Sequence, residues 1–357
     1  MKDFLQRIRA IYLRATLENA PGIGCKIIRA ITWLLMWPYM GAVKLRLWLF
    51  QKGLSPATKF AVPCVSVGNI TCGGTGKTPI VELVAKLIAK KWRRPAILSS
   101  GYHAWQMEEG LVTDEYLVHR QNLLEVPQYM GAESIPVLRD AIARNQMDCV
   151  ILDDGFQNFK VRRDIDIVVV DALNPFSNGY VIPRGLLREP VAALARATAI
   201  CITRSNQVSI DALKNLRARI ESLAPGKPII VTIHKATELS NTNNTEKKPC
   251  EWLAQRKVWA FCGIGNPESF RISLQKLGTN VLGFNAFPDH HHYTPEELSA
   301  IHRQAREAGA GALITTQKDG VKLLGMATVD SLPLLVLKIE VAVVQGAAEL
   351  QNNILNL

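Results

Sequence analysis

The sequence lacks several features that would assign it to a common structural class. The apolar run Ala30–Val43 is too short for a confident membrane span, which needs ~20 apolar residues. No CxxC pair occurs among the seven cysteines, and their odd number in a chain of 357 residues argues against a disulfide framework. No cleavage pattern of a signal peptide follows the charged N-terminus. These absences favour a reducing, cytoplasmic compartment.

The N-terminal end is strongly basic and carries aromatic residues. Residues 1–60 contain ten Lys or Arg against two acidic residues, which is +8 of the total charge of +11. Trp33, Trp37 and Tyr39 lie in the apolar run, and such side chains favour a membrane interface. We expect an interfacial helix that binds anionic headgroups. The alternatives are a buried helix kinked at Pro38 and, for the charge, nucleic acid.

Short β-branched runs alternate with helical patterns along the rest of the chain. Because several runs are continuously apolar, they predict strands buried on both faces, and the alternation predicts an α/β fold with a mainly parallel sheet. The predicted strands are Val62–Val67, Ala96–Ser99, Cys149–Leu152, Ile165–Val170, Ala199–Thr203, Pro228–Ile233, Val258–Gly263, Ala312–Thr315 and Leu334–Ile339. The predicted helices include Pro79–Lys91, Ile210–Leu223, Pro267–Leu277 and Thr294–Ala308. The polar segment Ser240–Pro249 is the best candidate for a linker.

A glycine-rich loop, GNITCGGTGKTP, follows the first predicted strand. Gly73, Gly74 and Gly76 let backbone N–H groups face an anion, and the following helix contributes its N-terminal dipole. Lys77 is placed to reach the outer phosphates of a nucleotide, and Thr78 to bind magnesium. The glycine expected five residues before Gly76 is absent, and the alternative is a tight glycine turn with an exposed lysine.

Acidic and basic residues after later strands complete a candidate site. Asp153 and Asp154 follow a buried strand, where such carboxylates hold magnesium in nucleotide sites or simply close a turn. Asp289 precedes His290, a pairing suited to a proton acceptor, although a solvated polar loop is an equal alternative. The basic segments around Arg162 and Arg184–Arg188 are either phosphate clamps or solvated loops.

Taken together, these blocks resemble one family, the tetraacyldisaccharide 4'-kinases of Gram-negative bacteria. The resemblance rests on "SVGNITCGGTGKTP", "SSGYHAW", "TDEYLV", "ILDDGFQNFKVRRDIDIVVVDA", "IPRGLLREP", "GIGNPESF", "FPDHHHYT" and "TTQKDGVKL" in that order. It covers about Pro63 to Leu323. Thr71 belongs to the TxGGxGKTP form of the loop, which accounts for the absent glycine. A related loop of membrane-partitioning ATPases carries a lysine where this chain has Cys72.

The resemblance implies a P-loop NTPase-like domain with a second, smaller α/β domain and an N-terminal membrane-associated helix. It implies transfer of the γ-phosphoryl of ATP, with Mg2+, to the 4'-hydroxyl of a lipid A disaccharide 1-phosphate precursor at the cytoplasmic face of the inner membrane. The basic end is then assigned to the membrane surface, and no nucleic-acid partner is expected. The corresponding segments are 1–48 for the helix, 49–239 for the P-loop domain, 240–253 for the linker and 254–357 for the C-terminal domain.

Site residues carry over position by position. The resemblance implies that Asp114 is the base for the sugar hydroxyl and that His290, after Asp289, partners it. The implied nucleotide-binding residues are Thr71, Gly73, Gly74, Thr75, Gly76, Lys77 and Thr78, and the implied metal ligands are Thr78, Asp153 and Asp154. The implied substrate-binding residues are Tyr102, Arg139, Gln157, Arg188 and Glu189.

Several positions depart from the family pattern and leave two other functions open. The departures are Ser100, His103, Thr113, Tyr116, Asn158, Leu186 and Gln317. They lie mainly where the shape of the acceptor cleft is set, so they bear on acyl pattern and on the grip on the 1-phosphate. The alternatives to the kinase are a membrane-associated P-loop ATPase without sugar-lipid kinase activity and a nucleotide-dependent scaffold.

Overall fold

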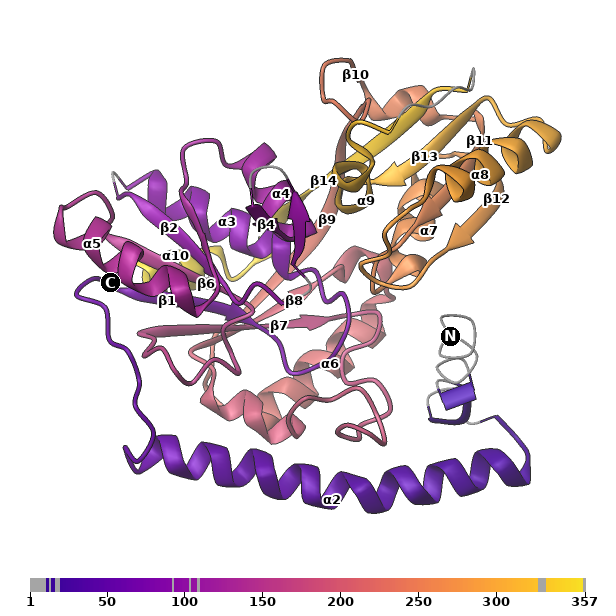
Figure 1. Ribbon diagram of the computed structural model, residues 1–357. Coiled ribbons are helices and arrows are strands. Elements are labelled where there is room, and N and C mark those ends of the chain that lie inside the picture. Colours follow the sequence, from indigo (N-terminus) through magenta and orange to yellow (C-terminus); the bar gives the residue numbers. More distant parts are fainter. Residues whose placement is uncertain are drawn as a thin grey trace.

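The computed structural model of the chain describes residues 11–12, 14–16, 20–91, 93–102, 104–107, 110–326 and 332–355. Within these residues one sheet of 12 strands runs through two lobes (Figure 1). The strand order is β12-β11-β13-β14-β9-β8-β7-β1-β6-β2-β5, with β10 paired to β9. This arrangement confirms the predicted α/β class with mainly parallel strands.

The first lobe holds the parallel strands from β9 to β5. Their bounds are β1 Cys64–Gly68, β2 Pro95–Ser99, β5 Gln128–Met130, β6 Cys149–Asp153, β7 Ile165–Asp171, β8 Ala199–Thr203 and β9 Ile229–Ser240. All five residues of β1, β6 and β8 are buried, as expected for strands covered on both faces. Strand β1 pairs with β6 and β7, so its carboxyl end lies between theirs. A small separate hairpin is formed by β3 Trp105–Met107 and β4 Gly110–Val112.

Helices cover both faces of this sheet. The first face packs against α3 Lys77–Ala89 and α10 Ala347–Leu355, through Val84 and Leu350 among others. The opposite face packs against α6 Ile210–Leu223, through Leu216 and Ile220. Further elements of this lobe are α4 Asp114–Asn122, η1 Ala132–Ser134, α5 Ile135–Ala143, η2 Val191–Arg196 and η3 Ser205–Gln207. Buried side chains on the sheet-facing stripe of each helix supply the core.

The second lobe repeats the same logic on a smaller scale. Its strands are β11 Lys257–Cys262, β12 Asn280–Ala286, β13 Ala312–Thr316 and β14 Leu334–Gln345. Its helices are α7 Pro267–Lys276, α8 Pro295–Glu307 and α9 Gln317–Gly320, with η4 Cys250–Leu253 and η5 Val321–Leu323. Helix α8 begins with the capping box expected from the sequence, in which Thr294 and Glu297 satisfy each other's backbone N–H groups.

Two long strands join the lobes. Strands β9 and β14 pair antiparallel from Val231 opposite Gln345 to Ser240 opposite Val336. Each continues beyond the end predicted from the sequence, because the antiparallel ladder between them extends past the apolar starts of both strands. After β9, the segment proposed as a linker forms a turn and the short strand β10 Lys247–Lys248, which pairs back onto β9. After β14, helix α10 returns to pack in the core of the first lobe.

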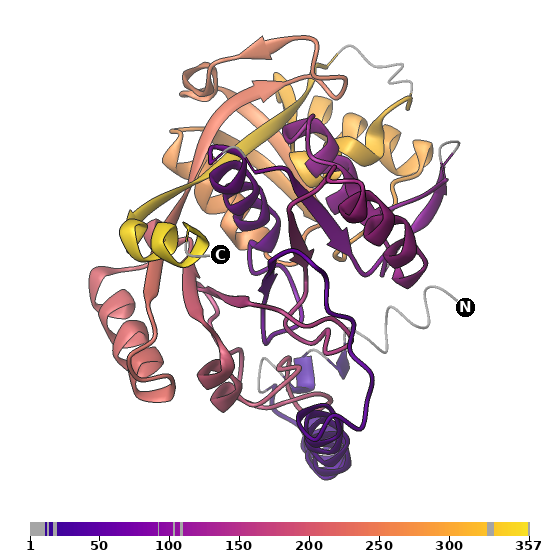
Figure 2. The same cartoon turned by 90° about the vertical axis from the view of Figure 1, so that its left-hand side faces the viewer.

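Helix α2, Ile23–Gln51, lies along the first lobe (Figures 1 and 2). It contains Pro38 and continues through it. Met36 is buried against the first lobe, and the Tyr39 hydroxyl donates a 2.9 Å hydrogen bond to the Arg188 carbonyl. A row of large apolar side chains remains exposed on it: Ile23, Ile27, Ile31, Trp33, Leu34, Leu35, Trp37, Leu45 and Trp48. Across the described residues, no helix combines the length and apolar character needed to cross a bilayer.

Candidate active site

The glycine-rich loop connects β1 to α3. Gly73 and Gly76 have φ angles of +107° and +84°, a region in which side chains are strained. Gly76 is the N-cap of α3, so the unpaired N–H groups at the start of this helix border the loop. Thr75 anchors the turn, because its hydroxyl accepts from Asn69 at 3.0 Å and its carbonyl accepts from Thr203 at 2.7 Å.

Other predicted loop residues hold the loop in place. Thr71 is buried and pairs with Leu187 in an isolated bridge. Gly74 lies against Gly265 of the second lobe, where a Cβ on Gly265 would come within 2.1 Å of the Gly74 nitrogen. The phosphate loop therefore touches the second lobe through two glycine backbones.

The two aspartates after β6 have different surroundings. The register pairs Asp153 with Val67 of β1, so both carboxylates emerge beside the loop. Asp154 is 3.5 Å from the Lys77 Nζ and accepts a 2.7 Å bond from Arg188. Although burial opposes ionisation of Asp154, the cations of Lys77 and Arg188 hold its pKa below the usual range.

The donor set around these aspartates fits magnesium. Asp154 Oδ1 is buried and accepts no hydrogen bond from the described residues. Thr78 lies in the first turn of α3, and hydroxyl and carboxylate oxygens are the hard ligands that Mg2+ prefers. Asp153, Asp154 and Thr78 are therefore suited to hold the ion directly or through water.

His119 is a neighbour of this acidic pair that the sequence did not reveal. Its Nε2 is 3.3 Å from the Asp153 carboxylate and its Nδ1 is 3.5 Å from Glu82 on α3. Burial alone would lower the pKa of His119, but the two carboxylates raise it to about 9. A histidine on an apolar helix face gives no sequence signal of this kind, because both partners come from other elements.

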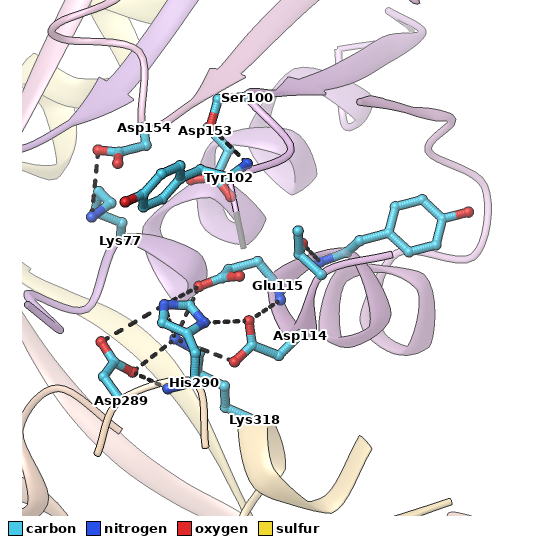
Figure 3. Close-up of polar contacts among 12 residues, drawn as sticks. Lys77, Ser100, Tyr102, Asp114, Glu115, Asp153, Asp154, Asp289, His290 and Lys318 are labelled. Atoms are coloured by element: carbon cyan, nitrogen blue, oxygen red, sulfur yellow. Dashed lines mark hydrogen bonds and ion pairs between the residues drawn. The ribbon is translucent and has the colours of Figure 1, made fainter. Parts of the chain in front are cut away.

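At the junction of the two lobes, α4 presents Asp114 to a loop of the second lobe (Figure 3). His290 Nδ1 is 2.9 Å from Asp114 Oδ1. Asp114 is fully buried, whereas 22% of the His290 side chain is exposed. Burial raises the pKa of Asp114, and although burial also opposes the charged imidazole, the hydrogen bond that the ring shares with the Asp114 carboxylate raises the pKa of His290. His290 has φ +60°, a strained value that marks many functional residues.

Lys318, which sequence analysis also missed, lies beside this pair. Its Nζ is 2.9 Å from Glu115, 3.3 Å from Asp289 and 3.6 Å from Asp114. Burial opposes its charge, yet the surrounding carboxylates raise the pKa of Lys318 above its ordinary value. The motif TTQKD held this lysine, but only the folded chain brings it to Asp114.

The remaining predicted residues fall into two groups. Gln157 donates to Glu189 and to the Asn69 carbonyl at 2.9 Å each, and Arg188 donates to Gln157 at 3.3 Å. These residues therefore form one network beside the phosphate loop. Tyr102 is 76% exposed in the loop after β2. Arg139 is exposed on α5, and His103 lies outside the described residues.

A buried ion pair connects the phosphate loop to the second lobe. Arg204 donates to Asp171 at 2.6 Å and to the Gly74 carbonyl at 3.0 Å. Asn266, the N-cap of α7, donates to the same Asp171 oxygen at 2.8 Å. The loop, the end of β7 and the start of α7 therefore share one polar cluster.

Comparison with known proteins identifies the family. The family model described as LpxK, tetraacyldisaccharide-1-P 4'-kinase, matches residues 28–357. This chain belongs to that family. A tetraacyldisaccharide 4'-kinase of Anaeromyxobacter dehalogenans is 36% identical over 330 residues, which cover 88% of this chain and 86% of the relative. One from Syntrophus aciditrophicus is 35% identical over 325 residues, covering 85% and 87%.

A solved structure of the family has the same fold. The structure of LpxK from Aquifex aeolicus, described as in complex with ATP, aligns with a TM-score of 0.69 and 28% identity. The alignment covers 92% of this chain and 99% of the Aquifex chain. The resemblance drawn from the sequence blocks is thus confirmed, and the chain is a kinase of lipid A biosynthesis rather than an ATPase or a scaffold.

Proposed function

We propose that this family member transfers the γ-phosphoryl group of ATP to the 4'-hydroxyl of a tetraacylated glucosamine disaccharide 1-phosphate, with Mg2+ bound beside the loop. The observation that carries the proposal is the 2.9 Å contact between Asp114 and His290. This contact joins the lobe that holds the phosphate loop to the second lobe. An enzyme that only hydrolyses a nucleotide transfers the phosphoryl group to water. It therefore needs no buried Asp–His pair to take a proton from an alcohol acceptor.

The phosphate side of the reaction is assigned to one set of residues. The loop residues Thr71 and Gly73–Thr78 bind the phosphates, and Lys77 neutralises charge on the transferring group. When bound, Mg2+ polarises the phosphate oxygens, and Thr78, Asp153 and Asp154 are the residues that would hold it. Lys77 pairs with Asp154 in this structure, so nucleotide phosphates would compete with Asp154 for the lysine.

The acceptor side is assigned to Asp114 and His290, with Asp289 next to them. As the sugar oxygen bonds to phosphorus and the bond to ADP breaks, the hydroxyl proton passes to this pair. The burial of Asp114 and the partial exposure of His290 support a refinement of the expectation from the sequence. In this refinement His290 meets the hydroxyl and Asp114 holds and stabilises the ring.

The substrate, membrane and domain assignments belong to the same proposal. Tyr102, Arg139, Gln157, Arg188 and Glu189 are assigned to substrate binding at the cleft. The exposed apolar row of α2 supports docking on the cytoplasmic face of the inner membrane, where the lipid acceptor is held. We retain 1–48, 49–239, 240–253 and 254–357 as functional segments, with α10 of the last segment packed on the first lobe.

One assay tests the proposal. The protein is incubated with γ-labelled ATP, Mg2+ and the disaccharide 1-phosphate lipid in detergent, and lipid and free phosphate are separated. We expect label in the lipid, at the 4' position. Label in free phosphate alone would instead support the ATPase, and no turnover would support the scaffold.

A further inference from the structure

Three carboxylates and one imidazole converge on the ammonium group of Lys318 (Figure 3). Its Nζ lies 2.9 Å from Glu115, 3.3 Å from Asp289, 3.6 Å from Asp114 and 3.5 Å from His290 Nε2. Asp114 and Glu115 come from the first lobe, whereas the other three residues come from the second. The lysine is therefore a contact between lobes as well as a local charge.

The backbone around Lys318 is fixed on both sides. The Gln317 amide donates to Gln121 at 3.1 Å and to Asn122 at 3.0 Å on α4, and accepts from Asn122 at 3.1 Å. Asp319 accepts from the Gly263 N–H at 3.0 Å and from the Tyr293 hydroxyl at 3.1 Å. The ammonium is thus held at a defined place by its two neighbours in the chain.

An ammonium group in this position constrains the protonation of His290. Lysine has only N–H donors, so a ring nitrogen that faces it is favoured as an acceptor. His290 Nε2 faces Lys318, and His290 Nδ1 faces the Asp114 carboxylate, which accepts. The arrangement favours the tautomer with the proton on Nδ1 and the lone pair on Nε2, which is the form able to take a proton from a hydroxyl.

The same ammonium occupies what is otherwise a candidate cation site. Asp114, Glu115 and His290 have ligand atoms within 4.8 Å of one another, an arrangement that can hold a metal ion. The Lys318 Nζ, 2.9 Å from Glu115, already places one positive charge among these groups.

We propose that Lys318 is a positioning residue for phosphoryl transfer, which disfavours a proton on His290 Nε2 and supplies the cation among Asp114, Glu115 and Asp289. This inference rests on the proposed role of the Asp114–His290 pair. The pH profile of the reaction depends on Lys318 together with all the other charged groups that face His290. These are Asp114 and Glu115 on α4, Asp289 and His292 on the adjacent loop, and Lys318 and Lys322 on α9 and η5.

The first test reads the imidazole directly and needs no enzyme activity. The full chain is labelled with ¹⁵N-histidine, and the His290 signals are assigned by their loss in His290→Gln. At about pH 9, well above the ordinary histidine pKa of ~6.5, we expect a protonated Nδ1 and an unprotonated Nε2. A proton on Nε2 at this pH would overturn the proposal, whether or not the protein phosphorylates lipid.

The second test removes the charge and keeps the bulk. Lys318→Met deletes the cation beside the imidazole, so protonation of Nε2 becomes easier. Its NMR midpoint and the acid limb of kcat/KM for the lipid both move up by on the order of one pH unit. We expect kcat to fall at least about tenfold, while KM for ATP stays within about twofold. Lys318→Arg keeps the positive charge, so we expect the acid limb of kcat/KM to stay at the same pH.

The control is Lys338→Met. Lys338 has the same side-chain exposure as Lys318, 22%, and pairs with Glu238 at 3.5 Å on the strands that join the lobes. We expect Lys338→Met to leave the acid limb of kcat/KM and the NMR midpoint of His290 unchanged. Thermal unfolding and ATP binding establish that each variant is folded. If Lys318→Met is folded and its midpoint equals that of the unaltered chain, the proposal is wrong. If the midpoint moves but no protein labels the lipid, the kinase assignment fails, and only the effect of Lys318 on the protonation of His290 stands.

Discussion

At the scale of single residues, Asp114 is the most consequential side chain of the acceptor site. It is fully buried, and its Oδ2 has no hydrogen-bond partner in the described part of the chain. This oxygen instead faces two ammonium groups, that of Lys318 at 3.6 Å and that of Lys322 at 3.9 Å, which stabilise the buried carboxylate by charge.

We predict that Asp114→Asn lowers kcat for lipid phosphorylation by ~10²-fold or more, because the amide cannot stabilise a charged His290. ATP binding should remain within about threefold, since Asp114 faces His290, Lys318 and Lys322 rather than the loop residues. Steady-state kinetics and a nucleotide-binding titration measure the two quantities. Wild-type turnover in this variant would remove Asp114 from the mechanism.

The sequence foresaw some of these residues and missed others for a physical reason. Asp114, His290 and Lys77 stand in blocks whose order matches the family, so the resemblance assigned them. The partner of His119, Asp153, lies 34 positions away in the sequence, and the partner of Lys318, Asp114, lies more than 200 positions away. Nothing in the local pattern around a lysine or a histidine reports which distant carboxylate it will meet.

At the scale of elements, α4 links the acceptor site to the phosphate site. Its first residue, Asp114, meets the second lobe, His119 in its middle meets Asp153, and Asn122 at its end donates to Glu82 at 2.9 Å. A shift of this nine-residue helix would therefore change the contacts of the proposed acceptor pair and of Asp153, the proposed metal ligand, together.

We predict that His119 makes folding stability depend on pH. Its pKa of about 9 in the folded chain exceeds the ordinary value of 6.5. The stabilisation is therefore complete below ~6.5 and is lost as the pH rises through about 9. Loss of the His119 charge should lower the free energy of unfolding by on the order of 1–3 kcal/mol. Urea unfolding without magnesium, at about pH 6 and about pH 9.5, measures the difference.

The comparison variant is His119→Gln, which keeps hydrogen-bonding capacity and has no titrating group. We expect its unfolding free energy to change less between the two pH values than that of the unaltered chain. Equal changes in both proteins would show that His119 is not the source of the dependence.

The sequence predicted the strands of the sheet better than their ends. The apolar runs that became β1, β6 and β8 were recognisable because both faces of each strand are buried. The short edge strand β5, and β12, which has exposed ends and a central glycine, lack that continuous apolar signal. Pairing between distant segments, such as β9 with β14, is a tertiary property that no local pattern encodes.

At the scale of the whole molecule, α2 carries an apolar row that the protein itself leaves uncovered. Leu34 is 61% exposed and Trp37 is 51% exposed, while Met36 and Tyr39 pack against the first lobe. One side of the helix is therefore bound to the protein and another is available to a lipid surface. The sequence predicted such an interfacial helix from its aromatic and basic residues.

We predict that the double substitution Leu34→Ser and Trp37→Ser weakens binding to vesicles containing anionic phosphatidylglycerol by at least about tenfold, because two large apolar side chains are removed. The packed residues of α2 are unchanged, so thermal unfolding should stay the same. Sedimentation with vesicles measures binding. Leu124→Ser is the control, since Leu124 is 87% exposed in the loop after α4. Undiminished binding of the double variant would contradict membrane docking through α2.

The antiparallel ribbon of β9 and β14 also has a mechanical consequence. The two strands continue from one lobe into the other as a paired ladder with two register shifts, between Lys338 and Ile339 and between Val343 and Gln345, and α10 anchors the returning strand on α3. A change in the angle between the lobes therefore bends a hydrogen-bonded ribbon rather than turning a loose joint. We expect bending to concentrate at the shift beside Lys338, where the ladder is locally interrupted, while the paired stretches on either side stay stiff.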